Sequence, residues 1–370
     1  MDREGRTMRA RAATACAAAL VLGGVSTATL ADNDRGRGKL DTRSGLTPDL
    51  NDPKISGNPD YGVCRGTSPK CYHDWKEGAV GDDARQNKVL IYSRTAGPRH
   101  ANLQPALAAG LNPPLSPTQN VAQRALIRWL TAEGVVVNWT EDVNTLAGQL
   151  GPGSTYKAVI FMSPTRDTLW KHGTAVNATS AVNTTTNAHL DAAKTALRQF
   201  MRAGGGFVGI HNAFGTEYNW PYYEGLLGNA NYYDHGANQD GTVVVVNKDS
   251  STAGLPGRWG FRDEWYNLRP FPTKVKFLLT VDENTLATKR STHPGHGRFH
   301  PVAWCQYYDG GRVWVTTLGH DGAAFTEDSG FPGQVEFQKL ITNGTLSAMG
   351  NLPFCTTHGH QDDDDDDDDD

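Results

Sequence analysis

Two histidines of this sequence follow apolar runs that predict β-strands. His211 comes directly after the run 207–210, and His320 comes soon after the run 312–317. In open α/β sheets, ligands bind outside the carboxyl ends of the strands, so two such side chains can share one crevice. Histidine is a good general acid, general base or metal ligand. We predict that both are catalytic; the alternative is that each imidazole only satisfies backbone groups in a turn.

One carboxylate is expected to join them from the segment 263–266, which reads Asp-Glu-Trp-Tyr. Alternation along a strand places Asp263 and Trp265 on one face and Glu264 and Tyr266 on the other, so only one acid faces a pocket easily. Glu264 is the predicted third catalytic residue. Imidazoles with one carboxylate suit a divalent ion, zinc above all, with an open position for substrate. The predicted metal ligands are His211, His235, Glu264 and His320.

Aromatic residues with polar tips are concentrated between positions 218 and 233. Flat rings that carry a polar group suit sugar recognition, and ordinary packing is the alternative for some of them. The loop 93–100, after the first predicted strand, adds basic groups that can reach the same crevice. The predicted substrate-binding residues are Arg99, His100, Asn212, Tyr218, Trp220, His300, Trp304 and Asp321.

The elements that position these residues alternate in type. Short apolar runs predict strands, and amphipathic stretches between them predict helices, one starting at Ser116 as N-cap with Pro117 next and ending at Gly134. The pattern indicates an α/β fold with a doubly wound, mainly parallel sheet and helices on both faces. The predicted strands are 88–93, 135–139, 156–162, 207–210, 242–246, 275–281, 301–308 and 312–317. A final helix is predicted over 334–348.

The length and the charge limit the class of protein. The chain has 370 residues and a net charge of −5, and without the nine aspartates at 362–370 the charge is +4. A near-neutral body excludes a typical nucleic-acid binder, and 38% hydrophobic content excludes a protein of many membrane spans. No nucleotide cofactor is expected. The predicted divisions are a signal peptide at 1–31, an irregular extension at 32–87, one α/β domain at 88–350 and a tail at 351–370.

The N-terminal segment predicts export. Arg9 and Arg11 precede the apolar run 12–25, and small residues follow up to Ala31. This is the pattern of a signal peptide, with a membrane anchor or an unstructured lead as the alternatives. We therefore expect a secreted or extracytoplasmic protein that has no membrane segment once the signal is removed.

Four cysteines remain after that segment: Cys64, Cys71, Cys305 and Cys355. An even number in an exported chain suggests disulfides. Among the three pairings we favour Cys64 with Cys71, which closes a small loop, and Cys305 with Cys355, which ties the last helical region to a strand. A zinc site of four cysteines is the alternative.

Many of these motifs stand in a characteristic order along residues 88–348. They comprise 88–100, 204–213, 218–223, His235, 254–256, 263–266, 282–283, 300–304 and 310–320. Together they resemble the ThuA-like (trehalose utilisation) family. The resemblance implies a class I glutamine-amidotransferase-like fold, which is flavodoxin-like with three α/β/α layers. His211 stands where amidotransferases carry their cysteine, so amidotransferase chemistry is not expected. Another departure is 249–252, where the family often has His-Pro.

Members of this family are associated with the catabolism of trehalose and related glycosides through 3-keto intermediates. We therefore expect an exported enzyme that acts on glycosides or their 3-keto derivatives by metal-assisted elimination or hydrolysis. Its partner would be a small or oligomeric sugar, and its oligomeric state stays open. The main alternative is a non-catalytic carbohydrate-binding or scaffold protein. A weaker alternative is metal storage or adhesion through His358, His360 and the aspartate tail.

Overall fold

The computed structural model describes the chain in six segments: residues 63–73, 85–151, 153–169, 192–218, 220–288 and 293–356. All of them fall in one of two units of the chain, Leu40–Asp370. The predicted signal peptide, most of the predicted extension and the aspartate tail lie outside the described residues. Among the described segments, no helix has the length and apolar character that a membrane crossing requires.

The described residues form one 10-stranded sheet in the order β3-β2-β4-β5-β10-β9-β8-β6-β7, and β1 pairs with β9 beside this path. The first five strands in that order are parallel. Counted along the chain, they stand in the order 2-1-3-4-5, the flavodoxin-like arrangement. The parallel strands are β2 (Lys88–Tyr92), β3 (Val136–Thr140), β4 (Ala158–Met162), β5 (Gly206–Ile210) and β10 (Gly311–Thr316).

The other half of the sheet is antiparallel. Its strands are β6 (Tyr232–Val245), β7 (Arg258–Leu268), β8 (Lys276–Asp282) and β9 (His300–Tyr308), and β1 (Arg65–Gly66) joins it at β9. The predicted α/β class is therefore confirmed, with a sheet more mixed than predicted. The extension that we expected to be irregular also contributes a strand.

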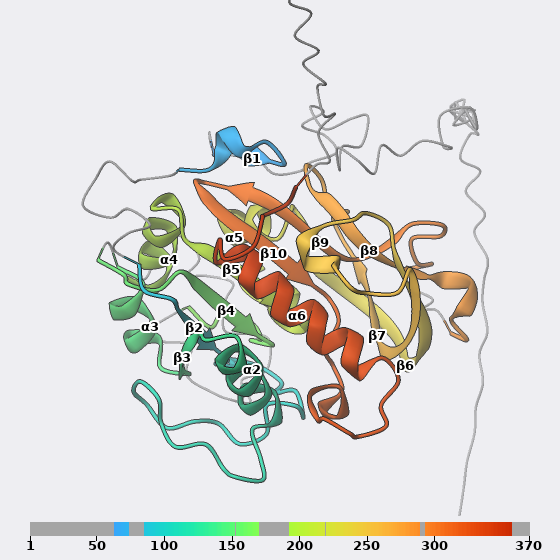
Figure 1. The fold of residues 1–370 in the computed structure, drawn as a ribbon, viewed down its shortest axis with the longest axis horizontal. Coiled ribbons are helices and arrows are strands. Elements are labelled where there is room, and N and C mark those ends of the chain that lie inside the picture. The colour runs from blue at the N-terminus through green and yellow to red at the C-terminus, as the bar shows by residue number, and fades with distance from the viewer. Residues whose placement is uncertain are drawn as a thin grey trace, which may run out of the picture. The chain divides into compact units, whose positions relative to one another are not determined.

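Helices cover both faces of the sheet (Figure 1). Along β2, Val89 and Ile91 belong to one core, which also holds side chains of two helices, α2 (Val121–Ala132) and α6 (Gln334–Ala348). Leu90, which lies between them, belongs to a second core on the opposite face. That core contains residues of α3 (Val143–Gln149), α4 (Ala192–Arg202) and α5 (Pro221–Leu226). The alternation along β2 thus gives the three expected layers.

The start of α2 differs from the predicted one. The helix begins after Asn120, which is in the left-handed region at φ 53°, and not at Ser116. The Asn120 amide donates to the carbonyls of Leu103 and Pro105, each at 2.9 Å, and its Oδ1 accepts the Ser116 N–H at 3.2 Å. Because Asn120 holds the long loop after β2, this tertiary role outweighs the local capping signal of Ser116 and Pro117. The predicted helix end at Gly134 is confirmed.

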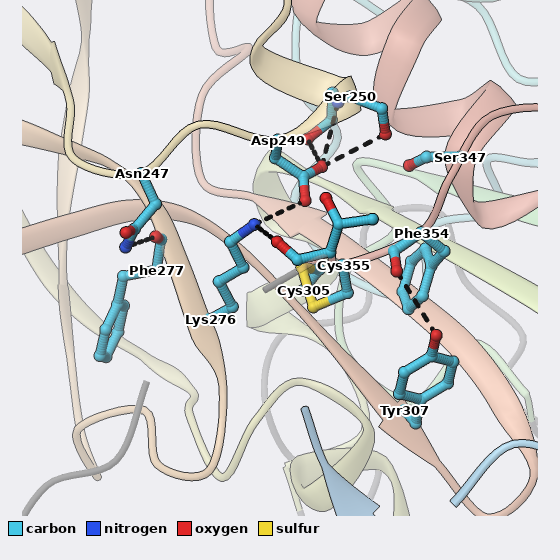
Figure 2. Close-up of a disulfide and its surroundings, with 12 residues drawn as sticks. Asn247, Asp249, Ser250, Lys276, Phe277, Cys305, Tyr307, Ser347, Phe354 and Cys355 are labelled. Atoms are coloured by element: carbon cyan, nitrogen blue, oxygen red, sulfur yellow. Dashed lines mark hydrogen bonds and ion pairs between the residues drawn. A yellow bond between two sulfur atoms is a disulfide. The ribbon is translucent and has the colours of Figure 1, made fainter. Parts of the chain in front are cut away.

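Both favoured cysteine pairings are confirmed: Cys64 is bonded to Cys71, and Cys305 to Cys355. Figure 2 shows the second disulfide, which ties the segment after α6 to β9. Beside it, the Lys276 ammonium lies 2.9 Å from the Asp249 carboxylate, and both side chains are buried. Lys276 also donates to the carbonyl of Thr356. The end of the described chain is therefore held by the disulfide and by a hydrogen bond from the lysine of this ion pair.

The family departure at 249–252 has a structural role here. Asp249 accepts the Ser251 N–H at 3.0 Å, and its own N–H donates to the Thr252 hydroxyl at 2.9 Å. These two bonds form a capping box on the short 3₁₀ helix Ser250–Thr252. Asp249 thus serves both the cap and the buried ion pair.

We expect Lys276→Met to lower the free energy of unfolding by about 3–5 kcal/mol, because it leaves the Asp249 charge buried without its cation. The matched control is Arg258→Met, which breaks the exposed pair with Asp282 (2.6 Å) and should cost less than about 1 kcal/mol. Chemical denaturation of the disulfide-intact proteins measures both values. Equal losses in the two variants would contradict the importance of burial.

Candidate functional site

A cavity of about 770 Å³ opens at the carboxyl ends of the parallel strands. Its walls come from the loops after β2, β4, β5 and β10 and from the β6–β7 pair. This is the place where open α/β sheets bind ligands. The lining residues are Pro98, Arg99, His100, Ala101, Thr165, Arg166, Asp167, Asn212, Gly215, Tyr218, Tyr232, Tyr233, His235, Glu264, Tyr266 and His320.

Four side chains converge beside this cavity: His100, Glu264 and His320 line it, and the fully buried His211 does not. Each offers one ligand atom, and these atoms all lie within 4.8 Å of one another. Three of them are among the predicted metal ligands, and His100 was predicted to bind substrate instead. The fourth predicted ligand, His235, lies outside the group. Its Nε2 is 3.5 Å from the Glu264 carboxylate, and its Nδ1 is 2.6 Å from the Gly236 carbonyl.

The orientation of His211 is fixed on both sides of the ring. The residue is fully buried and starts the 3₁₀ helix His211–Gly215 at φ 51°, in the left-handed region. Its Nδ1 lies 2.8 Å from the Thr317 carbonyl, which can only accept, so we assign the proton to Nδ1. Its Nε2 then accepts from the Tyr266 hydroxyl at 2.8 Å. In metal-ligating histidines, the ring nitrogen that does not bind the metal donates a hydrogen bond of the kind that Nδ1 makes to Thr317, and this bond fixes the tautomer.

Burial sets the charge of this imidazole. It lowers the pKa of His211 well below its ordinary value, and the neighbouring His100 and His320 lower it further. Burial, together with His320, also lowers the pKa of His100 to about 4. Both rings are therefore neutral at physiological pH, which is the form that ligates metals.

Two buried nitrogens of the cluster lack hydrogen bonds. The Nδ1 atoms of His100 and His320 have no hydrogen-bond partner among the described residues. The His320 Nδ1 does lie 3.0 Å from the Glu264 carboxylate, but the two are not aligned as a hydrogen bond. An unsatisfied buried polar atom costs about 1–3 kcal/mol. A bound cation would satisfy these atoms at once.

The charges of Glu264 and His320 are coupled. Burial raises the pKa of the Glu264 carboxyl, but the adjacent His320 and His235 outweigh this and leave it below its ordinary value. Burial works against protonation of His320, yet Glu264 outweighs it and raises the pKa of that imidazole. The carboxylate is therefore ionised and available as the anionic member of the donor set.

Asp263, on the other face of β7, positions two members of the cluster. Its carboxylate accepts the N–H groups of Gly319 at 2.7 Å, Glu264 at 2.8 Å and His320 at 3.3 Å. Burial raises its pKa to about 7, and these three bonds act against that shift. Gly319 has φ 124°, which favours glycine, and turns the chain into His320. The predicted alternation is borne out, since Glu264 and Tyr266 line the cavity and Asp263 does not.

Arg99 lines the cavity, but its guanidinium is occupied by the protein. It lies 2.7 Å from the buried Glu141 carboxylate and donates to the carbonyls of Gln104 at 2.5 Å and Pro105 at 3.0 Å. These contacts give Arg99 a positioning role, and its contact with substrate stays a prediction. Arg99 holds the loop that carries His100.

Two predicted substrate-binding residues of β9 lie inside the protein, which corrects the expectation that they line the cavity. Trp304 is fully buried, and its indole donates to the Leu227 carbonyl at 3.0 Å. His300 is buried between the Glu283 carboxylate, at 2.7 Å, and the Tyr266 carbonyl, at 2.9 Å. All nine residues of β9 are buried, so neither of its faces meets solvent.

Two further expectations are corrected in the same way. Trp220 is buried and stacks on Tyr222, with ring centroids 5.2 Å apart. Asp321 accepts the Ala323 N–H at 2.9 Å and caps the 3₁₀ helix Gly322–Phe325. Neither residue is among those that line the cavity.

Asn212 and Tyr218 do line the cavity, as predicted. Sequence reasoning did not select Tyr266 as a site residue, although alternation placed it beside Glu264. It also missed Arg166 and Asp167, which follow β4. The strand-end argument that selected His211 would have found them if it had been applied to this strand as well.

Several proteins of known structure resemble this chain. No curated protein is significantly similar to the chain. Among solved structures, a protein described as ThuA-like from Bacteroides uniformis has 19% identity, covers 72% of this chain and 92% of its own, and has a TM-score of 0.45. Another so described, from Parabacteroides merdae, has 17% identity, covers 72% and 90%, and has a TM-score of 0.47. The β-galactosidase of Rahnella sp. R3 has 14% identity, covers 73% and 32%, and has a TM-score of 0.40.

The family model ThuA, described as trehalose utilisation, matches residues 88–346. The match spans every parallel strand and every residue that lines the cavity. It agrees with the family resemblance of the sequence motifs. The chain therefore belongs to the ThuA family.

Proposed function

We propose that this protein is an exported carbohydrate-processing enzyme that acts on glycosides or their 3-keto derivatives by elimination or hydrolysis, with the help of one divalent metal ion. The observation that carries the proposal is the convergence of His100, His211, Glu264 and His320 within 4.8 Å. Membership of a trehalose-utilisation family supports a carbohydrate substrate.

The donor set fits a metal ion of the zinc type. Three protein ligands, drawn here from the three imidazoles and the carboxylate, are the set that zinc takes in catalytic sites, where the fourth position stays open for water or substrate. The Nδ1 atom of His100, which has no hydrogen-bond partner among the described residues, and the fixed tautomer of His211 support this assignment. The second coordination layer is present at Nδ1 of His211, which donates to the Thr317 carbonyl. The Nε2 lone pair becomes available to the ion when the Tyr266 hydroxyl donates to Asn212 Oδ1, at 3.4 Å, instead of to Nε2.

A bound divalent cation supplies Lewis-acid polarisation of a substrate carbonyl, such as the keto group of a 3-keto-glycoside. The C–H next to that carbonyl would then be acidified, and Glu264 or a histidine outside the metal ligands would take its proton. His235 is that histidine. It lies 3.5 Å from Glu264 with 30% of its side chain exposed, so it also connects the carboxylate to solvent. Departure of the glycosidic oxygen from the next carbon then completes an elimination.

The rest of the cavity suits a sugar. Tyr218, Tyr232 and Tyr233 line it, and aromatic rings with hydroxyl tips contact both the C–H faces and the hydroxyl groups of sugars. Export is supported by the two disulfides, which persist in oxidising compartments, and by the predicted signal peptide.

We expect the purified protein to bind one zinc ion per chain, and His320→Ala to weaken the affinity by more than roughly 100-fold, because outer-layer changes alone cost about 10–100-fold. Isothermal titration of metal-stripped protein with zinc measures this. His235→Gln is the matched control and should keep the metal, since His235 lies outside the cluster. Unchanged affinity in the His320 variant would disprove the metal assignment.

We expect Glu264→Gln to slow turnover of 3-keto-glycosides by about 10²–10⁴-fold, the range of a lost general base. Chelation should have a comparable effect on the unmodified enzyme. A panel of glycosides and their 3-keto derivatives, assayed with and without zinc, provides the measurement, and the exposed Glu133→Gln serves as the control. Glycan binding without turnover in any protein would instead favour a carbohydrate-binding module.

A further inference from the structure

Asp167 lines a part of the cavity wall that the proposed mechanism does not yet use. It lies in the loop after β4, which runs beside β2 in the sheet. The chain order of the parallel strands reverses here, since β2 has β3 on one side and β4 on the other. Such a reversal marks the ligand crevice of doubly wound sheets.

The loop that carries Asp167 has an unusual and well-fixed backbone. Ser163 (φ 45°) and Arg166 (φ 62°) are both in the left-handed region, which costs a non-glycine residue about 1–3 kcal/mol. The Arg166 N–H donates to the Gly215 carbonyl at 2.9 Å, and its own carbonyl accepts the Glu217 N–H at 3.2 Å. Strain that is held in place in this way is common at functional sites.

The carboxyl group of Asp167 is buried and incompletely paired. The residue is 2% exposed, and its Oδ2 has no hydrogen-bond partner among the described residues. Behind it, the buried Lys194 ammonium lies 2.9 Å from the Glu217 carboxylate. Burial and, after it, the Glu217 carboxylate raise the pKa of Asp167 to about 7, with Lys194 and Arg166 acting against the shift. A substantial fraction of the Asp167 side chains is therefore in the neutral, protonated form near pH 7.

Two tyrosines, Tyr218 and Tyr266, line the cavity together with Asp167 and two histidines of the cluster. Burial raises the pKa of Tyr218 and of Tyr266; Arg166 acts against the first shift, and Tyr218 adds to the second. Tyr266 in turn donates to His211 at 2.8 Å. Asp167 and three members of the cluster, His100, Glu264 and His320, line the same cavity.

We propose that Asp167 is the general acid that protonates the leaving group of the sugar substrate. The proposal rests on the proposed function, because a proton donor needs a glycosidic bond to act on. As the bond between the sugar carbon and the glycosidic oxygen breaks, the Asp167 O–H bond breaks too, and its proton goes to that oxygen. The leaving group departs as a neutral alcohol, and solvent returns a proton to the carboxylate.

The test compares two leaving groups in wild type and in Asp167→Asn. The probes are 4-nitrophenyl 3-keto-α-glucoside, whose phenolate leaves without a proton, and methyl 3-keto-α-glucoside, whose alkoxide needs one. We expect kcat for the methyl glycoside to fall about 10²–10⁴-fold in the variant, while the nitrophenyl glycoside is turned over within about threefold of wild type. Asp142→Asn is the matched control, because asparagine also caps α3 at that position.

The outcomes separate the two proposals. A wild-type enzyme that turns over neither probe removes the proposed function and this role with it. A wild-type enzyme that is active on both, with equal rate losses or none in Asp167→Asn, overturns the acid role alone.

A stability measurement tests the buried acid without any substrate. The folded-state pKa of Asp167 is about 7 and the unfolded value about 4, so wild type loses stability relative to Asp167→Asn as the pH rises from about 4 to 7. Unfolding midpoints across this interval should record that change. A variant less stable than wild type at about pH 8 would identify Asp167 as a structural ion and overturn the proposal.

Discussion

The site depends on one buried carboxylate, that of Asp263. It accepts three backbone N–H groups, one from Glu264 on β7 and two from the turn Gly319–His320 after β10. Three other strands separate β7 from β10 in the sheet order, so the antiparallel half must bend back for this contact to form. It fixes the backbones of Glu264 and His320 relative to each other, and their side chains then meet at 3.0 Å.

The two halves of the sheet divide the work of building the cavity. The parallel half supplies His100, His211 and His320 from loops at strand ends, where backbone geometry is set by the loop. The antiparallel half supplies Glu264 and Tyr266 from one face of β7, where their spacing is set by the strand. The cluster therefore forms where the two halves of the sheet meet, and both halves must be folded for its four residues to come together.

Much of this arrangement could be predicted because it follows from local rules. Strand ends selected His211 and His320, and strand alternation predicted that only one of Asp263 and Glu264 faces the pocket. The even cysteine count predicted disulfides, and the short loop between Cys64 and Cys71 favoured the pairing that the structure has. The class of fold followed from strands alternating with helices. Each of these features depends on residues that are close together in the sequence, so each can be predicted from the sequence.

The remainder depends on distant contacts. His100 joins the cluster because Arg99 and Glu141 fold its loop, and nothing in the loop sequence indicates that pair. Trp304 and His300 looked like site residues because they begin a strand near the motifs, but β9 is covered on both faces. The helix start moved from Ser116 to Asn120 for a similar reason, since the Asn120 amide serves carbonyls far away in the chain.

The buried His300 has a consequence for attempts to change what the cavity accepts. Its Nε2 donates to the backbone carbonyl of Tyr266, and the hydroxyl of that tyrosine orients His211. The His211 ring is thus aligned through Tyr266, whose backbone is held by the buried His300. Variants of the cavity-lining Tyr218, Tyr232 and Tyr233 should leave this alignment in place, whereas variants of the buried residues of β9 should disturb it.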